Sequence, residues 1–180
     1  MSLITTERLE LRRFRLNDLM DFYAFAQNPN IGPDAGWEPH KSALESFEVL
    51  IEYRKQKTHW VVTEKGIDRF IGSISLRLDE KRLNPSALAL GYSLDEPYWG
   101  QGYMSEASLA VIHHAFVVLK ADLLSVYHYP HNERSKRVIE KCGFLYEGRL
   151  RQAKKRLNGE RLDECCYSLT REEYEAREGI

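Results

Sequence analysis

The sequence predicts an α/β fold in which a mixed, mostly antiparallel sheet is flanked by helices. Segments with strand and helix periodicity follow one another in the order β-α-α-β-β-β-α-β-α-β-β, and no repeat or low-complexity linker interrupts them. The chain has 180 residues, enough for one domain with a sizeable core. We therefore expect residues 1–180 to form a single domain.

The first strand and the first helix are predicted close to the N-terminus. Leu9 and Leu11 alternate with polar residues within 8–14, which indicates a strand. Asn17 is a typical N-cap residue and predicts a helix over about 18–27.

A loop and a second helix are expected next. Residues 28–40 are rich in proline and glycine, which predicts irregular structure. Ser42 and Glu45 have the spacing of a capping box, so a helix is predicted from there to about Lys57.

The rest of the chain contains the other predicted strands and two more helices. Apolar runs typical of strands occur at 59–64, 69–78, 86–94, 123–129, 144–152 and 161–170. Helices are expected at about 103–119 and at 132–143, the latter with Asn132 as N-cap and Gly143 as its C-terminal glycine. The pair Asn158–Gly159 predicts a hairpin turn between the last two strands.

Composition argues against several classes of protein. The formal net charge is −1, so bulk electrostatic attraction to nucleic acid or to an anionic membrane is not expected. The three cysteines do not make a disulfide framework, no Cys/His spacing is typical of a zinc site, and a reducing compartment is indicated. The N-terminus lacks the apolar core of a signal peptide, and no apolar run approaches the roughly 20 residues of a membrane span. We expect a cytoplasmic protein without a metal, either a monomer or a homodimer.

Two glycines between a predicted strand and a predicted helix indicate a site for a phosphate. Backbone N–H groups at such a helix N-terminus bind anions, and Gly100 and Gly102 lack the Cβ atoms that would keep a phosphate away. A tight turn without a ligand is the alternative. A dinucleotide fingerprint needs a third glycine where Ser105 stands, and a nucleoside triphosphate loop needs a lysine that is absent. The candidate ligand that remains is a pyrophosphate bound through backbone N–H groups alone.

Four segments together resemble the GNAT superfamily of acyl-CoA-dependent N-acetyltransferases, in the branch typified by ribosomal-protein N-terminal acetyltransferases. They are "TERLELRRF", "LGYSLDEPYWGQGYMSEA", "NERSKRVIEKCGF" and "LNGERLDECCYSL". The resemblance covers almost the whole chain. It implies a sheet splayed at the fourth strand, with the pantetheine arm of acetyl-CoA in the splay and the pyrophosphate at the N-terminus of the following helix.

The resemblance also implies the residues that bind the coenzyme. The pyrophosphate loop corresponds to Trp99, Gly100, Gln101, Gly102, Tyr103 and Met104, with Ser105 just inside the helix. The thioester carbonyl and the pantetheine amides are expected against the backbone of Tyr92, Ser93 and Leu94. The general superfamily pattern has Gln or Arg in place of Trp99, which is usual in this branch, and Gly or Ala in place of the bulkier Met104.

The segment "NERSKRVIEKCGF" places three polar residues on the helix predicted at 132–143. Asn132 is either only an N-cap or also a contact to pantetheine. Ser135 lies on the apolar stripe 135, 138, 139, 142, so its hydroxyl is expected to point inward. The resemblance suggests that Ser135 binds the coenzyme or protonates the departing thiolate; bonding to a carbonyl of the preceding turn is the alternative. Lys136 and Arg137 lie beside this stripe, and either is a candidate to bind the 3′-phosphate of CoA; a solvated helix face is the alternative.

The residue expected to accept the proton of the amine is missing. Many relatives have a glutamate two residues before the Gly-Tyr pair, where this chain has Ala89. Neutralising a lysine side chain at pH 7 costs about 4.6 kcal/mol, whereas neutralising an α-amine costs about 1.1 kcal/mol. The sequence therefore favours an N-terminal or small-molecule amine over a protein lysine.

Other groups are candidates for the base and for the acceptor wall. Asp163 and Glu164 lie on a terminal strand that borders the acceptor side in relatives, and His40 has a pKa suited to base catalysis. A surface or structural role is the alternative for each. The loop 28–40, which ends at His40, is expected to form part of the acceptor wall. Within it, Trp37 either lines the substrate cleft or closes a small separate core.

The leading hypothesis is an acetyl-CoA-dependent N-acetyltransferase that transfers the acetyl group directly to a primary amine in a ternary complex. The backbone near 92–94 is expected to polarise the thioester carbonyl. The alternative, favoured by Ala89, is a CoA-binding sensor domain without turnover. A nucleic-acid-binding module lacks a basic signal in the sequence.

Overall fold

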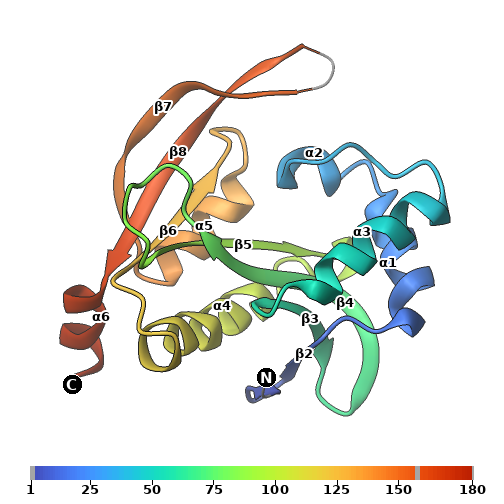
Figure 1. The fold of residues 1–180 in the computed structure, drawn as a ribbon, viewed down its shortest axis with the longest axis horizontal. Coiled ribbons are helices and arrows are strands. Elements are labelled where there is room, and N and C mark those ends of the chain that lie inside the picture. The colour runs from blue at the N-terminus through green and yellow to red at the C-terminus, as the bar shows by residue number, and fades with distance from the viewer. Residues whose placement is uncertain (1–2, 157–158, 180) are drawn as a thin grey trace. The chain divides into compact units, whose positions relative to one another are not determined.

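The computed structural model describes residues 3–156 and 159–179, in which strands and helices alternate (Figure 1). The chain divides into two compact units. The first comprises Met1–Ser75 and Tyr92–Val111, and the second comprises Leu76–Gly91 and Ile112–Ile180. Strands β4 (Ile67–Leu78) and β5 (Ala87–Leu94) and helix α4 (Tyr103–His113) contribute residues to both units. The expectation of a single domain stays a prediction.

The first unit contains a run of antiparallel strands. The order is β1 (Ile4–Thr5), β2 (Leu9–Arg12), β3 (His59–Glu64) and β4, and each strand pairs with the next. The helical segments of this unit, apart from α4, are η1 (Leu16–Asp18), α1 (Leu19–Ala26), α2 (Gly32–Ala35), α3 (Ala43–Lys55) and η2 (Glu96–Tyr98).

An aromatic core holds the helices of the first unit against its strands. Helices α1 and α3 pack side by side (Figure 1). Four phenylalanines and four aliphatic residues make up the buried cluster: Phe14, Phe22, Phe25, Ala26, Ile31, Leu50, Val61 and Phe70. Phe70 of β4 meets Phe25 of α1 nearly edge to face, with ring centroids 5.1 Å apart, an arrangement that aromatic quadrupoles favour.

The first predicted N-cap is wrong and the second is right. Asn17 lies inside η1, whereas Arg15 precedes η1 and Asp18 precedes α1. The Asp18 carboxylate accepts a hydrogen bond from the Arg15 N–H at 2.7 Å, so it stabilises this helical start in place of an asparagine. Ser42 caps α3 as predicted, because its Oγ accepts from the Glu45 N–H at 3.2 Å.

The expectation of irregular structure throughout 28–40 is also wrong, since it contains the short helix α2. Pro33 stands in the first turn of α2, where its missing N–H costs nothing. The helix ends at Gly36, whose φ of +96° is the left-handed conformation that glycine adopts without strain.

The second unit contains both parallel and antiparallel strand pairs. The order is β5, β6 (Leu123–His128), β8 (Arg161–Thr170) and β7 (Leu145–Lys155); the pair β5–β6 is parallel, and the pairs β6–β8 and β8–β7 are antiparallel. That pairing runs from Ala87 to Leu90 on β5, which continues for four more residues to Leu94. Strands β7 and β8 form a long hairpin (Figure 1). The predicted mixed, mostly antiparallel α/β fold is confirmed.

Two predicted features and one unpredicted helix complete the second unit. Its helical segments are the π-helical η3 (His114–Val118), α5 (Glu133–Lys141) and α6 (Arg171–Glu178). Gly143 follows α5 with a φ of +84°, as its predicted role at the helix end requires. Within the predicted turn Asn158–Gly159, Asn158 lies outside the described residues and Gly159 has a φ of +87°.

The helix α6 was not predicted, although its capping box is visible in the sequence. Thr170 Oγ1 accepts from the Glu173 N–H at 3.2 Å, and the Glu173 carboxylate accepts from the Thr170 N–H at 2.8 Å. Tyr174 stacks on Phe116 with ring centroids 4.7 Å apart, which anchors α6 in its unit. Within residues 3–156 and 159–179, no helix combines the length and the apolar character needed to cross a membrane.

Candidate functional site

The glycine turn before α4 has the geometry of an anion cradle. Gly100 and Gly102 have φ values of +74° and +81°. This is the left-handed backbone conformation, which other residues adopt only with strain. A Cβ at Gly100 would meet nothing within 4 Å, so the turn is open there. The helix that follows has eleven residues, and the N–H groups of a first turn have no partner within the helix. The residues present therefore fit a pyrophosphate bound through backbone N–H groups.

Side chains of the predicted loop anchor it to the rest of the first unit. The indole N–H of Trp99 donates to the Leu94 carbonyl at 2.7 Å, and the Gln101 side-chain amide donates to the Pro97 carbonyl at 2.8 Å. The Tyr103 hydroxyl donates to Glu64 of β3 at 3.0 Å. Met104 and Ser105 are both buried, so the bulkier Met104 is accommodated in the core rather than at the surface of the loop.

The end of β5 lies in very close contact with a glycine of β4. A Cβ at Gly72 would stand 2.5 Å from the Ser93 carbonyl oxygen and 3.0 Å from Leu94 Cα. The Asp95 N–H just beyond donates to the Ile71 carbonyl at 2.8 Å. Gly72 thus sets the backbone of the segment Tyr92–Leu94. Sequence analysis missed this residue, although a glycine inside a strand pattern signals a close backbone approach.

The three polar residues predicted on α5 have distinct environments in the second unit. The Asn132 side-chain oxygen accepts from the Ser135 N–H at 3.0 Å, so Asn132 is the N-cap as predicted. Ser135 is partly buried on the same side as buried Ile139. Lys136 lies 3.8 Å from the Glu133 carboxylate in an exposed ion pair. The cap role is confirmed, and the coenzyme contacts of these residues stay predictions.

Ala89 of β5 lies beside a buried polar network. It pairs with Ser125 of β6, and laterally paired residues project to the same face of a sheet. Ser125 is fully buried, and its Oγ accepts from Arg82 Nε at 2.8 Å. The Tyr127 hydroxyl donates to the Asp79 carboxylate at 2.7 Å. This network was missed because its members come from distant parts of the sequence.

The network holds its ionisable groups in fixed protonation states. Burial alone raises the pKa of Asp79, but hydrogen bonds from Ser125, Tyr127 and the Lys81 N–H outweigh it and lower the pKa overall. Burial and the hydrogen bond to Asp79 raise the pKa of Tyr127. Asp79 is therefore ionised and Tyr127 protonated at neutral pH. The lowered pKa makes the Asp79 carboxylate a weak base, and protonated Tyr127 is not in the form that accepts a proton.

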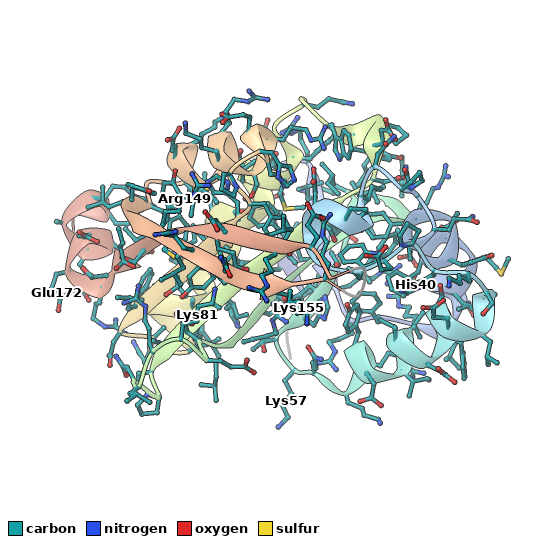
Figure 2. All side chains as sticks on the ribbon, turned by 90° about the horizontal axis from the view of Figure 1, so that it is seen from above. His40, Lys57, Lys81, Arg149, Lys155 and Glu172 are labelled. Atoms are coloured by element: carbon teal, nitrogen blue, oxygen red, sulfur yellow. The ribbon has the colours of Figure 1, made fainter. Side chains whose placement is uncertain are left out.

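Both carboxylates proposed as bases on β8 are paired with cations. Asp163 accepts from the Gln152 N–H and from Arg149 Nε, each at 2.7 Å, and these bonds lower its pKa, the Gln152 bond most strongly. Glu164 forms an ion pair with Lys81, which lies beside the β7–β8 hairpin that carries Arg149 (Figure 2). These pairings stabilise the ionised form of the carboxylate, and the lowered pKa makes Asp163 a weaker base.

His40 and Trp37 contribute to the core of the first unit. His40, labelled in Figure 2, is buried, and its Nδ1 lies 2.7 Å from the Ser46 hydroxyl. Burial lowers the pKa of His40 against the opposing charge of Glu45, so the imidazole is neutral at pH 7. Trp37 packs on the aromatic core cluster and its indole N–H reaches the Ala26 carbonyl at 3.4 Å. Of the two interpretations of Trp37, this placement favours closure of a core.

The cysteines and acidic residues form no evident metal centre. Cys142 and Cys166 are buried, Cys165 is partly buried, and all three are free thiols. Burial raises the pKa of the Cys166 thiol. In the part of the chain that the structure describes, no group of three or more His, Cys, Asp and Glu side chains is arranged to hold a metal ion.

Comparison with known proteins assigns a family to this geometry. Residues 8–145 match the family model described as "Acetyltransferase (GNAT) domain". The ribosomal-protein-serine acetyltransferase of Escherichia coli strain K12 is 38% identical over 86 residues, which are 48% of this chain and 47% of that protein.

Two solved structures share the fold. The acetyltransferase (GNAT family) from Bacillus anthracis matches with a TM-score of 0.85 at 23% identity, covering 95% of this chain and 99% of that chain. RimL, a ribosomal L7/L12 α-N-protein acetyltransferase in complex with coenzyme A, matches with a TM-score of 0.78 at 21% identity, covering 94% of this chain and 98% of that chain. The fold predicted from the sequence is the fold of these proteins.

Proposed function

The chain belongs to the GNAT family of acetyltransferases, and we propose that it takes its acetyl group from acetyl-CoA and transfers it to a primary amine. The observation that carries this proposal is the cradle before α4, where two glycines with positive φ precede a helix of eleven residues. The relative RimL was solved with coenzyme A, which supports the same ligand here.

Two segments of the first unit would bind the coenzyme through their backbone. The loop Trp99–Met104, with Ser105 at the helix start, would hold the pyrophosphate by its N–H groups. The segment Tyr92–Leu94 would bond the pantetheine amides and polarise the thioester carbonyl. Bound acetyl-CoA supplies the activated acyl group.

From the family resemblance alone, we also propose coenzyme contacts for residues of α5 and its cap. Asn132 would contact the pantetheine arm, and Lys136 would meet the 3′-phosphate. The Ser135 hydroxyl would hydrogen-bond the coenzyme or donate a proton to the departing thiolate, which remains its predicted role. Partial burial of Ser135 supports a contact away from bulk water.

A direct assay tests the proposed activity. The protein is incubated with acetyl-CoA and a pool of amines and peptides, while release of free thiol and the thermal unfolding midpoint are followed. We expect thiol release that depends on an amine, together with a raised midpoint in the presence of coenzyme. A raised midpoint without thiol release across a wide acceptor set would instead identify the alternative function, a CoA-binding sensor.

The preferred acceptor follows from the weak basicity of the groups available. Ala89 replaces the expected glutamate, Asp163 and Glu164 are paired with cations, and Asp79 has a lowered pKa. Without a strong base, an acceptor with a nearly neutral amine is favoured, so we propose a protein N-terminus or a weakly basic small molecule.

Matched peptides measure this preference. One peptide presents a free α-amine with its lysine blocked, and the other presents a free lysine with its N-terminus blocked. The difference in the cost of neutralisation corresponds to a kcat/KM about 100-fold or more higher for the α-amine at pH 7. Equal or higher efficiency on the lysine peptide would contradict the proposed acceptor class.

A further inference from the structure

Arg8, just before β2, contacts the turn before α4. Its Nη1 donates to the Gln101 carbonyl at 3.0 Å, and its guanidinium lies 4.4 Å from the centroid of the Tyr103 ring. A Cβ at Gly102 would stand 3.5 Å from Arg8 Nη2. The guanidinium therefore borders the turn at its second glycine, Gly102, and at the two residues that flank this glycine.

Arg8 also neutralises an acidic residue in the first turn of α4. Its Nε donates to the Glu106 carboxylate at 2.6 Å, and its backbone N–H donates to the same carboxylate at 2.8 Å. Thr6 adds a hydroxyl donor at 2.6 Å. Burial alone raises the pKa of Glu106, but these bonds outweigh it and lower the pKa overall, so Glu106 is ionised.

An ionised glutamate at this place conflicts with binding of a pyrophosphate. The Glu106 N–H makes the first bond of the helix, to the Gly102 carbonyl at 3.0 Å, so Glu106 lies one turn from the cradle. Its negative charge competes for the positive end of the helix dipole and repels a second anion there. The carbonyl of Gln101 likewise presents a partial negative charge. Arg8 offsets both.

We propose that Arg8 is a positioning residue for the coenzyme, which neutralises Glu106 and turns the Gln101 carbonyl away so that the cradle favours a pyrophosphate. The proposal rests on the proposed function, since it concerns the same loop. Thr6 and Arg8 belong to the segment "TERLELRRF", to which sequence analysis gave only the role of an opening strand.

A charge-rescue cycle tests the proposal. The variants are Arg8→Met, Glu106→Gln, the double variant, and Lys57→Met as a control that removes an exposed positive charge near the end of α3 in the same unit. Dissociation constants are measured by calorimetry for CoA and for pantetheine, which has no pyrophosphate. Thermal unfolding midpoints check that each variant is folded.

The expected pattern is specific to the pyrophosphate. Arg8→Met weakens binding of CoA about 10-fold, the size of one partly screened charge interaction across a helix turn, and leaves pantetheine unchanged. Glu106→Gln binds CoA as tightly as the parent protein or more tightly. The double variant recovers most of the lost affinity, because it no longer holds an unpaired carboxylate, and Lys57→Met has no effect.

Three results would overturn the proposal. They are unchanged CoA affinity in Arg8→Met, an equal loss for CoA and pantetheine, and no recovery in the double variant. A parent protein that does not bind CoA would refute the proposed function itself, whereas these three results would leave that function standing.

Discussion

Replacing Gly72 with alanine is expected to remove most of the activity and part of the stability. The new Cβ would meet the Ser93 carbonyl oxygen at 2.5 Å and Leu94 Cα at 3.0 Å, and both are backbone atoms that no rotamer change can move away. The strand end must shift, which costs about 3 kcal/mol of unfolding free energy. Because we propose that Tyr92–Leu94 bind the thioester, a shift of this segment by about 1 Å should lower kcat/KM about 100-fold.

The neighbouring residue provides the control for this prediction. Ser73 is buried like Gly72, but its contact to Ser93 is a long one, with 3.4 Å between the two hydroxyl oxygens. Ser73→Ala should therefore cost less than about 1 kcal/mol. Urea unfolding and steady-state rates are measured for both variants. A Gly72→Ala protein as active and as stable as Ser73→Ala would show that the end of β5 does not depend on this contact.

Breaking the ion pair between Arg12 and Asp18 is expected to have the largest effect on stability. The side chains are only 7% and 6% exposed, and two hydrogen bonds of 2.6 and 2.9 Å join them side on. Asp18→Ala leaves a buried guanidinium without this partner, which costs about 3 to 5 kcal/mol. Asp18 also accepts from the Arg15 N–H, so the start of α1 is weakened too.

Two further variants separate the buried charge from other effects. The double variant Arg12→Met/Asp18→Leu removes both charges and should be more stable than Asp18→Ala, because no unpaired charge is buried. Asp68, which also pairs with Arg12, is 58% exposed, so Asp68→Asn should cost less than about 1 kcal/mol. Urea unfolding at pH 7 measures all three. Equal losses in Asp18→Ala and Asp68→Asn would show that burial of the pair contributes nothing.

Local signals in the sequence were sufficient for most of the elements. The cap at Asn132, the glycine after α5 and the alternation of apolar and polar residues in the strands each depend on a few neighbouring residues. Such signals can be recognised in the sequence without knowledge of the tertiary structure. The errors also have local explanations. Asn17 has the right chemistry for a cap, but the Asp18 carboxylate, held by Arg12, stabilises the helical start instead.

The helix α6 shows where periodicity is a poor guide. Its sequence is mostly charged, so it has no apolar stripe to reveal it. One residue, Tyr174, supplies its anchor by stacking on Phe116, 58 residues earlier in the chain. Its capping box, Thr170 with Glu173, was the signal available.

In the candidate site, too, some residues could be identified from local sequence motifs and others only from the tertiary structure. The cradle is a local motif, so Gly100 and Gly102 could be identified from the sequence, and the family follows from four such motifs. The groups that surround the motifs are brought together only by the tertiary structure. Gly72 meets Ser93 from another strand, and Arg8 reaches Glu106 across 98 residues of sequence.

By itself, the sequence determined the α/β fold class, the family and the glycine turn before α4, because each depends on residue types at short and regular spacing. Only the tertiary structure decided which charged and polar groups are paired. It placed Arg8 on Glu106, Lys81 on Glu164 and Tyr127 on Asp79. The physical reason is that burial and ion pairing depend on distance in space, and no spacing along the chain encodes the distance between residues that folding brings together.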